Sequence, residues 1–221
     1  MPMARSTFVA SLAVLSMLGL AASRHAPLDA APVATAAGQV EPSDRWLDGL
    51  TAKHRQFFDT PSPNGGIPLI HVLNYYDTYN KAYGVKDSDI DAVLTFYGST
   101  TFHALNDAAW AKYQLGDFLG VNDPVSGKPA TANPWRAAPV ILGQPLAAAG
   151  LESLRARGAT LIVCNNALQI FAGMLAAKRG LQAGDVYADL KASILPGVDL
   201  VPGMVVAVEQ ATRAGLSYHR Q

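Results

Sequence analysis

The sequence predicts an α/β domain in which helices cover both faces of a mainly parallel sheet. Stretches with helical spacing of apolar residues alternate along the chain with short apolar runs rich in β-branched residues. The runs at residues 90–97 and 160–164 are almost continuously apolar, as parallel strands are when both faces are buried. Glycine follows several of the helical stretches and marks their ends. Together these observations indicate a three-layer α/β/α sandwich.

The N-terminus has the pattern of a secretory signal peptide, which we place at residues 1–23. Arg5 precedes an apolar run from Phe8 to Leu20, and small residues follow that run. The run is short for a membrane anchor, so we expect no stable membrane span after processing. We therefore expect a periplasmic or secreted protein.

The rest of the chain divides into a tether and one domain. Residues 24–42 are rich in Ala and Pro and lack periodicity, which predicts a flexible tether. Residues 43–221 are numerous enough for a single domain with its own hydrophobic core. Within this domain we expect a long insertion at about 99–140.

The composition limits the classes of partner. Lys and Arg together number 17, as do Asp and Glu, so the net charge gives no reason to expect nucleic acid or an anionic membrane surface. A single cysteine cannot form an internal disulfide. The sequence has no glycine-rich phosphate motif and no zinc-type ligand spacing, which argues against nucleotide and zinc enzymes.

The first half of the domain begins with an ambiguous segment. Residues 43–58 carry large apolar side chains at helical spacing, which predicts a helix. A loop rich in Pro and Gly follows, then a helix over residues 67–83 and the strand at 90–97. Asn106 can cap a short helix that ends near residue 113.

The second half opens with an unusually long connection. Residues 116–139 contain several Gly and Pro residues without sustained periodicity, and connections of that size are usually lids, binding loops or interaction surfaces. Beyond it the pattern predicts helices at 146–157, 167–179, 183–193 and 204–214, and strands at 160–164, 198–201 and 216–219.

The only cysteine, Cys164, stands where the strand at 160–164 ends and a helix is expected to begin. Parallel strands bring their carboxyl ends to one edge of the sheet, so His103, which follows the strand at 90–97, should converge on it. We expect Cys164 to be a catalytic thiol activated by His103. The simpler alternatives are a cysteine that packs in the core and a histidine at the surface or before a helix start.

Five further residues are candidates for contacts with a ligand at this edge. The side chains of Asn165 and Asn166 follow Cys164 directly, and their alternative role is to cap the helix. Tyr97 and Ser99 lie at the end of the neighbouring strand. Trp135 lies in the long connection, where it lines a pocket or, more simply, packs to hold the loop.

His71 offers a different chemistry. It lies in the helix at 67–83, where its simpler role is at the edge of the core. With His103 it could supply axial ligands to a haem or to a metal ion. The chain has no C-x-x-C-H motif, so any haem would be bound without covalent attachment.

Three sequence features together resemble one known family. They are Val163-Cys164-Asn165-Asn166, the segment Leu195-Pro196-Gly197-Val198 that continues to Val201-Pro202-Gly203, and the final Gly215-Leu216-Ser217-Tyr218. In order and spacing they resemble the DsrE family of sulfur-relay proteins, over roughly residues 67 to 220.

The resemblance implies a DsrE- or DsrF-like domain with a parallel sheet of about five strands that associates as a trimer or hexamer. It also implies a first strand near residues 54–59, in place of the helix that the spacing there predicts. The family role of the matching cysteine, which carries a persulfide between partner proteins, falls on Cys164. No cofactor is expected for that role.

Two functions of different classes remain open. The first is an exported sulfur carrier or transferase with an extended loop, which uses Cys164 and a sulfur-donor or sulfur-acceptor protein as its partner. The second is a binding module in which the same edge, roofed by residues 99–140, holds a small ligand or haem, with His71 and His103 as ligands.

Overall fold

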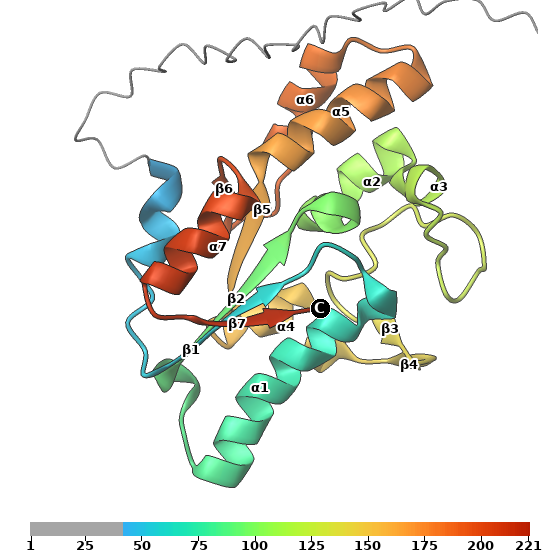
Figure 1. Ribbon diagram of the computed structural model, residues 1–221. Helices are drawn as coiled ribbons and strands as arrows, with labels where there is room; N and C mark the ends of the chain where they lie inside the picture. The colour runs from blue at the N-terminus through green and yellow to red at the C-terminus, as the bar shows by residue number, and fades with distance from the viewer. Residues whose placement is uncertain (1–41) are drawn as a thin grey trace, which may run out of the picture. The chain divides into compact units, whose positions relative to one another are not determined.

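The computed structural model describes residues 42–221 and has a five-stranded sheet at its centre (Figure 1). The expected signal peptide and most of the expected tether lie outside these residues. The strands are β1 (His54–Asp59), β2 (Ile90–Phe96), β5 (Thr160–Cys164), β6 (Val198–Val201) and β7 (Ser217–Arg220). They lie in the order β6-β5-β2-β1-β7 and every pair is parallel, which confirms the predicted fold class.

The register brings the carboxyl ends of neighbouring strands to one edge. Phe96 of β2 is level with Val163 of β5, and Asp59 of β1 is level with Arg220 of β7. Since side chains alternate across a strand, Phe96 and Val163 face one side of the sheet and Cys164 faces the other. This alternation decides which residues can meet at the edge.

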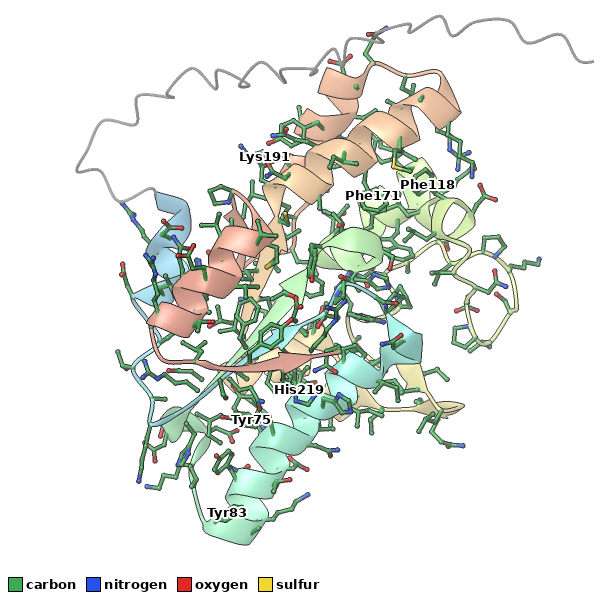
Figure 2. The ribbon with its side chains drawn as sticks, viewed as in Figure 1. Tyr75, Tyr83, Phe118, Phe171, Lys191 and His219 are labelled. Atoms are coloured by element: carbon green, nitrogen blue, oxygen red, sulfur yellow. The ribbon has the colours of Figure 1, made fainter. Side chains whose placement is uncertain are left out.

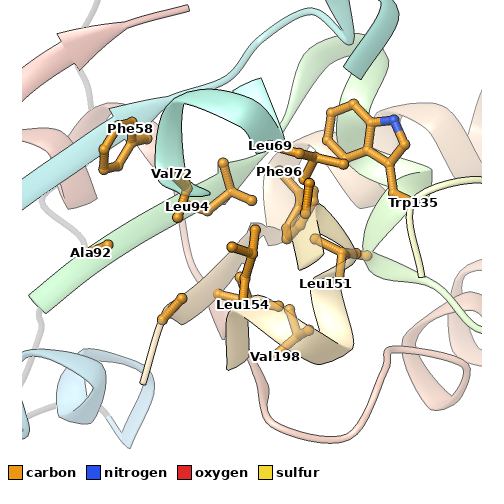
Figure 3. Close-up of a cluster of buried hydrophobic side chains, with 14 of the residues drawn as sticks. Phe58, Leu69, Val72, Ala92, Leu94, Phe96, Trp135, Leu151, Leu154 and Val198 are labelled. Carbon is orange, nitrogen blue, oxygen red and sulfur yellow. The ribbon is translucent and has the colours of Figure 1, made fainter. Parts of the chain in front are cut away.

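Helices α1 (Ile67–Tyr83) and α4 (Leu151–Ala156) cover the first face. The close-up in Figure 3 shows Leu69 and Val72 of α1 and Leu154 of α4 packed with Leu94 and Phe96 of β2. Because these side chains are almost fully removed from water, this face provides a large share of the hydrophobic stabilisation.

The opposite face is covered by the 3-10 helix η1 (Pro42–Leu47) and by α7 (Met204–Arg213). Trp46 of η1 and Met204 of α7 pack with Phe57, Ile162 and Cys164 of the sheet. The helical prediction for residues 43–58 is therefore wrong beyond Leu47. Phe57 and Phe58 point to opposite faces and are both buried in β1, as the family resemblance implied.

A third hydrophobic cluster, separate from those on the two faces, lies beyond the carboxyl edge of the sheet. It is formed by the 3-10 helix η4 (Gly98–Ala104), α2 (Asp107–Tyr113), α3 (Leu115–Leu119), α5 (Asn165–Arg179) and α6 (Ala183–Ala192). Phe102 of η4 lies between Phe118 of α3 and Phe171 of α5, with ring centroids 5.8 and 5.5 Å away. Figure 2 shows Phe118 and Phe171 on the facing sides of these helices.

The long connection is ordered around close backbone contacts. It leads into a short hairpin, β3 (Val140–Ile141) and β4 (Gln144–Pro145), and then into the 3-10 helix η5 (Ala147–Ala149), so the helix predicted from residue 146 begins only at Leu151. Two further 3-10 turns, η2 (Asn64–Gly66) and η3 (Asp87–Asp89), precede α1 and β2. Among residues 42–221, none of the helices combines the length and apolar character needed to cross a bilayer.

Candidate functional site

Cys164 is the last residue of β5 and the N-cap of α5. Its sulfur accepts hydrogen bonds from the backbone N–H groups of Ala167, at 3.4 Å, and of Met204, at 3.3 Å. These donors belong to the first turns of α5 and α7, whose N-termini carry partial positive charge. The side chain is unpaired and only 5 % exposed. The sulfur is therefore a hydrogen-bond acceptor for the starts of two helices.

The two asparagines after Cys164 have different environments. The Asn165 side-chain oxygen accepts a hydrogen bond from the Tyr187 hydroxyl of α6 at 2.6 Å, which joins α5 to α6. Asn166 is exposed, and its backbone N–H donates to the Pro202 carbonyl at 3.3 Å. Asn166 is thus the one of the pair that is free to meet a ligand beside the thiol.

Exposed apolar side chains lie on the same two helices. Val205, in the first turn of α7, is 81 % exposed, and Val206 beside it is also exposed. On α5, Ile170 and Met174 are 63 % and 53 % exposed and are one turn apart. Exposed apolar side chains of this kind are suited to contact with another protein.

A polar cluster that the sequence analysis missed lies at the same edge, on the face of Cys164. The buried carboxylate of Asp59, at the end of β1, accepts a hydrogen bond from the Tyr218 hydroxyl at 2.5 Å. Tyr97, just after β2, packs against the cluster that contains Cys164, and burial together with the nearby Asp59 carboxylate raises its pKa. An acidic residue at the end of a strand was the signal that could have identified Asp59.

The structure does not bring His103 to Cys164. The His103 ring lies 4.2 Å from the Trp135 ring, and Trp135 in turn packs on Phe96, on the face opposite Cys164. Among the residues that the structure describes, no hydrogen bond or ring contact joins the imidazole to the thiol. The expected pairing of these two groups is therefore not seen.

His103 instead lies at the wall of a cavity beneath the long connection. The side chain is 1 % exposed, and burial lowers its pKa to about 3, so the ring is neutral near pH 7. Its Nδ1 atom has no hydrogen-bond partner. The cavity has a volume of about 1100 Å³ and is lined by His103, Trp135 and most of residues 121–141.

Two side chains hold the loops around the end of β2 through hydrogen bonds to backbone carbonyls. The Asn133 amide donates hydrogen bonds of 2.7 Å to the carbonyls of His103 and Leu105, which holds the turn before Trp135. Ser99, a predicted ligand contact, donates its hydroxyl to the Pro61 carbonyl at 3.1 Å. Ser99 therefore ties two loops together in this structure.

His71 and His103 line different cavities, so the structure does not bring them together as a pair of axial ligands. His71 lies in a second groove, of about 660 Å³, between α1 and the β1–β7 edge, where its ring is 5.2 Å from that of His219. Within residues 42–221 there is no group of three or more His, Cys, Asp or Glu side chains that could hold a metal ion.

Comparisons of the chain with protein-family models, with curated proteins and with solved structures found no match. The resemblance to the DsrE family stays a prediction from the sequence. Any functional assignment therefore rests on the residues and contacts described above.

Proposed function

We propose that this protein is an exported, DsrE-like sulfur carrier in which Cys164 holds sulfane sulfur as a persulfide. One observation carries the proposal: the Cys164 sulfur accepts backbone N–H groups from the first turns of two helices. These fixed dipoles stabilise a thiolate, which is the nucleophilic form of cysteine. After loading, the negative charge of the persulfide lies on the outer sulfur, one S–S bond beyond these donors.

The transfer step needs no metal or nucleotide. The Cys164 thiolate attacks the outer sulfur of a donor persulfide, R–S–SH, so that a new S–S bond forms at Cys164 while the donor S–S bond breaks. The donor leaves as the thiolate R–S⁻, and the proton stays on the transferred sulfur or passes to water. An acceptor thiolate then repeats the exchange in the opposite sense.

The partners of this step are proteins. The exposed Val205 and Val206 adjoin Met204, whose N–H group contacts the thiol, so a donor or acceptor docked on these valines would reach Cys164. Ile170 and Met174 on α5 provide the apolar surface for a homo-oligomer, a trimer or hexamer as the family resemblance implies.

The export of the protein is proposed from the pattern of its N-terminal residues. N-terminal sequencing of the mature chain tests whether that segment is removed.

Mass spectrometry after incubation with a polysulfide tests the sulfur-carrier function. The unaltered protein should gain one sulfur atom, which dithiothreitol removes, and Cys164→Ser should gain none. Serine also accepts backbone hydrogen bonds, so this variant should keep its fold, which thermal unfolding checks. If native Cys164 resists both polysulfide and alkylation, and Cys164→Ser mainly lowers the melting temperature, the thiol is a core residue and the proposal fails.

The cavity beneath the long connection favours a second candidate, a module that binds a small molecule. The specific observation is the buried Nδ1 of His103, which has no partner within the protein although it lies at the wall of a cavity of about 1100 Å³. A polar ligand or an ordered water in the cavity would give this atom the hydrogen bond that buried nitrogens normally have.

Native mass spectrometry tests this second candidate. A retained ligand would add mass that disappears on denaturation, survives in Cys164→Ser and is lost in His103→Phe, which fills the imidazole space without its nitrogens. An unchanged native mass for the purified protein in all three forms would reject the candidate.

A further inference from the structure

The groove between α1 and the β1–β7 edge has a lining unlike that of the thiol site or the cavity of His103. Its volume is about 660 Å³, and the side chains that shape it include His54, His71, Tyr75, Tyr79, Tyr83 and His219. Figure 2 shows Tyr75 and Tyr83 on α1 and His219 on β7. Strand β7 is at the edge of the sheet, so one side of the groove is open to solvent.

One wall of the groove is a ladder of aromatic rings. Tyr75, Tyr79 and Tyr83 recur at every fourth position of α1, with ring centroids 5.1 and 5.6 Å apart. The His54 ring lies 4.2 Å from that of Tyr79 on the strand side. Neighbouring rings meet at 85° and 48°, so they form a continuous aromatic wall of about 12 Å along the helix, which suits an extended apolar ligand better than a compact polar one.

At the other end of the groove, two imidazoles adjoin each other. The His71 and His219 rings are 5.2 Å apart, and the His219 ring stacks on Phe58 at 5.6 Å. His71 uses Nδ1 in a hydrogen bond with the side-chain oxygen of Gln221. In the tautomer that carries its proton on Nδ1, the Gln221 oxygen accepts that proton and Nε2 keeps its lone pair.

This arrangement matches the usual environment of a metal-binding histidine, in which one ring nitrogen donates to an oxygen while the other binds the metal. Two imidazoles are too few protein ligands for a site that binds a free metal ion. One or two are enough for a metal ion that a flat macrocycle already coordinates.

We propose that this groove binds an iron porphyrin without covalent attachment, with Nε2 of His71 as axial ligand to the iron. The tyrosine ladder packs against the macrocycle, and His219 lies beside the iron. The site is distinct from Cys164, so it stands or falls independently of the sulfur-carrier function.

Titration of haemin into the full-length protein tests the proposal. The visible spectrum should convert with one equivalent to that of an imidazole-ligated haem. His71→Ala should abolish this spectrum and weaken binding by about tenfold or more, and free imidazole should restore the spectrum by occupying the vacated position. Gln221→Ala, which removes the oxygen that orients His71, should weaken binding by about tenfold.

Two controls make the test decisive. Cys164→Ser should bind haemin as the unaltered protein does, which separates this site from adventitious ligation by the thiol. Lys81→Ala changes an exposed residue of the same helix and should have no effect. The proposal is overturned if His71→Ala, shown to be folded by circular dichroism, gives the unaltered spectrum, or if Cys164→Ser is the variant that loses it.

Discussion

At the scale of single residues, the burial of His103 makes the stability of the protein depend on pH. The folded protein holds the ring neutral because charging it would place a cation among Trp110, Trp135 and the rest of the core. Its pKa is about 3 in the fold, against an ordinary value of 6.5. At pH values between about 3 and 6.5, the His103 imidazole therefore binds a proton in the unfolded chain but not in the native state.

This difference predicts a loss of stability on acidification. As pH falls from 6.5 towards 3, the free energy of unfolding should decrease by up to about 1.4 kcal/mol per pH unit from His103 alone. His219, whose pKa is also lowered, adds in the same direction. Urea unfolding of the protein and of His103→Gln at several pH values between about 7 and 5 checks this expectation. Equal slopes for both proteins would contradict it.

The sequence was sufficient to place Cys164 at a strand end and a helix start, because both boundaries have strong local signals. It was not sufficient to place His103 relative to Cys164. Both follow neighbouring strands, but η4 coils after Gly98, whose positive φ of 57° and close approach to the Pro61 carbonyl turn the chain sharply. That turn carries His103 to the opposite face, and it depends on a tertiary contact.

At the scale of elements, Arg157 joins three segments of the first face. From the end of α4, its guanidinium donates to Asp87 of η3 at 2.8 and 3.1 Å, to Asp77 of α1 at 2.6 Å and to Asn80 at 2.7 Å. It also lies 4.8 Å from the centre of the Tyr76 ring. A planar group with several fixed donors is needed to satisfy all of these partners.

Replacement of Arg157 by lysine should therefore destabilise the protein although the charge is kept. We expect a loss of about 1–2 kcal/mol, because an ammonium group cannot form the paired hydrogen bonds to Asp87. Lys81→Ala, which removes an exposed partner of Asp77, should cost less than about 0.5 kcal/mol. Chemical denaturation of both variants measures their free energies of unfolding. If Arg157→Lys loses no more stability than Lys81→Ala, the planar geometry of the guanidinium group is not what stabilises these contacts.

The strands and most helices could be predicted because their apolar periodicity is local. The segment at 54–59 could not be assigned from periodicity alone, since Phe57 and Phe58 fit a helix and a strand equally until pairing with β2 and β7 decides. The conformation of the long connection could not be predicted from the sequence for a similar reason. It is held by close backbone approaches, such as Gly116 against Ala130 and Gly150 against Ala137, which leave no periodic pattern.

Gly116 provides a direct test of these contacts. A Cβ atom there would lie 2.3 Å from the Ala130 backbone, so Gly116→Ala should displace the connection and cost about 1–3 kcal/mol. Gly173 on α5 has nothing within 4 Å of such an atom, and Gly173→Ala should instead stabilise the protein by about 0.5–1 kcal/mol. Thermal unfolding compares the two. A neutral Gly116→Ala would show that the connection is not held at this point.

At the scale of the whole molecule, the apolar surface of α5 predicts self-association. Light scattering at micromolar concentration should show a trimer or hexamer, and the double change Ile170→Glu and Met174→Glu should yield monomers by placing charge in the interface. Val125→Glu, at a still more exposed apolar residue of the long connection, serves as the control and should leave the assembly intact. A monomer before any substitution would reject this prediction.

The hydrogen bonds to Cys164 also couple the chemical state of its sulfur to the first turns of α5 and α7. One sulfur atom holds the first turns of two helices, which begin at Asn165 and at Met204, so chemistry at that atom affects both helices at once. When a second sulfur is added, the charge moves outward and the N–H groups of Ala167 and Met204 must follow it or lose their acceptor. Hydrogen exchange at these two amides should then distinguish the loaded from the empty protein, and a docked partner on α7 would sense the same difference.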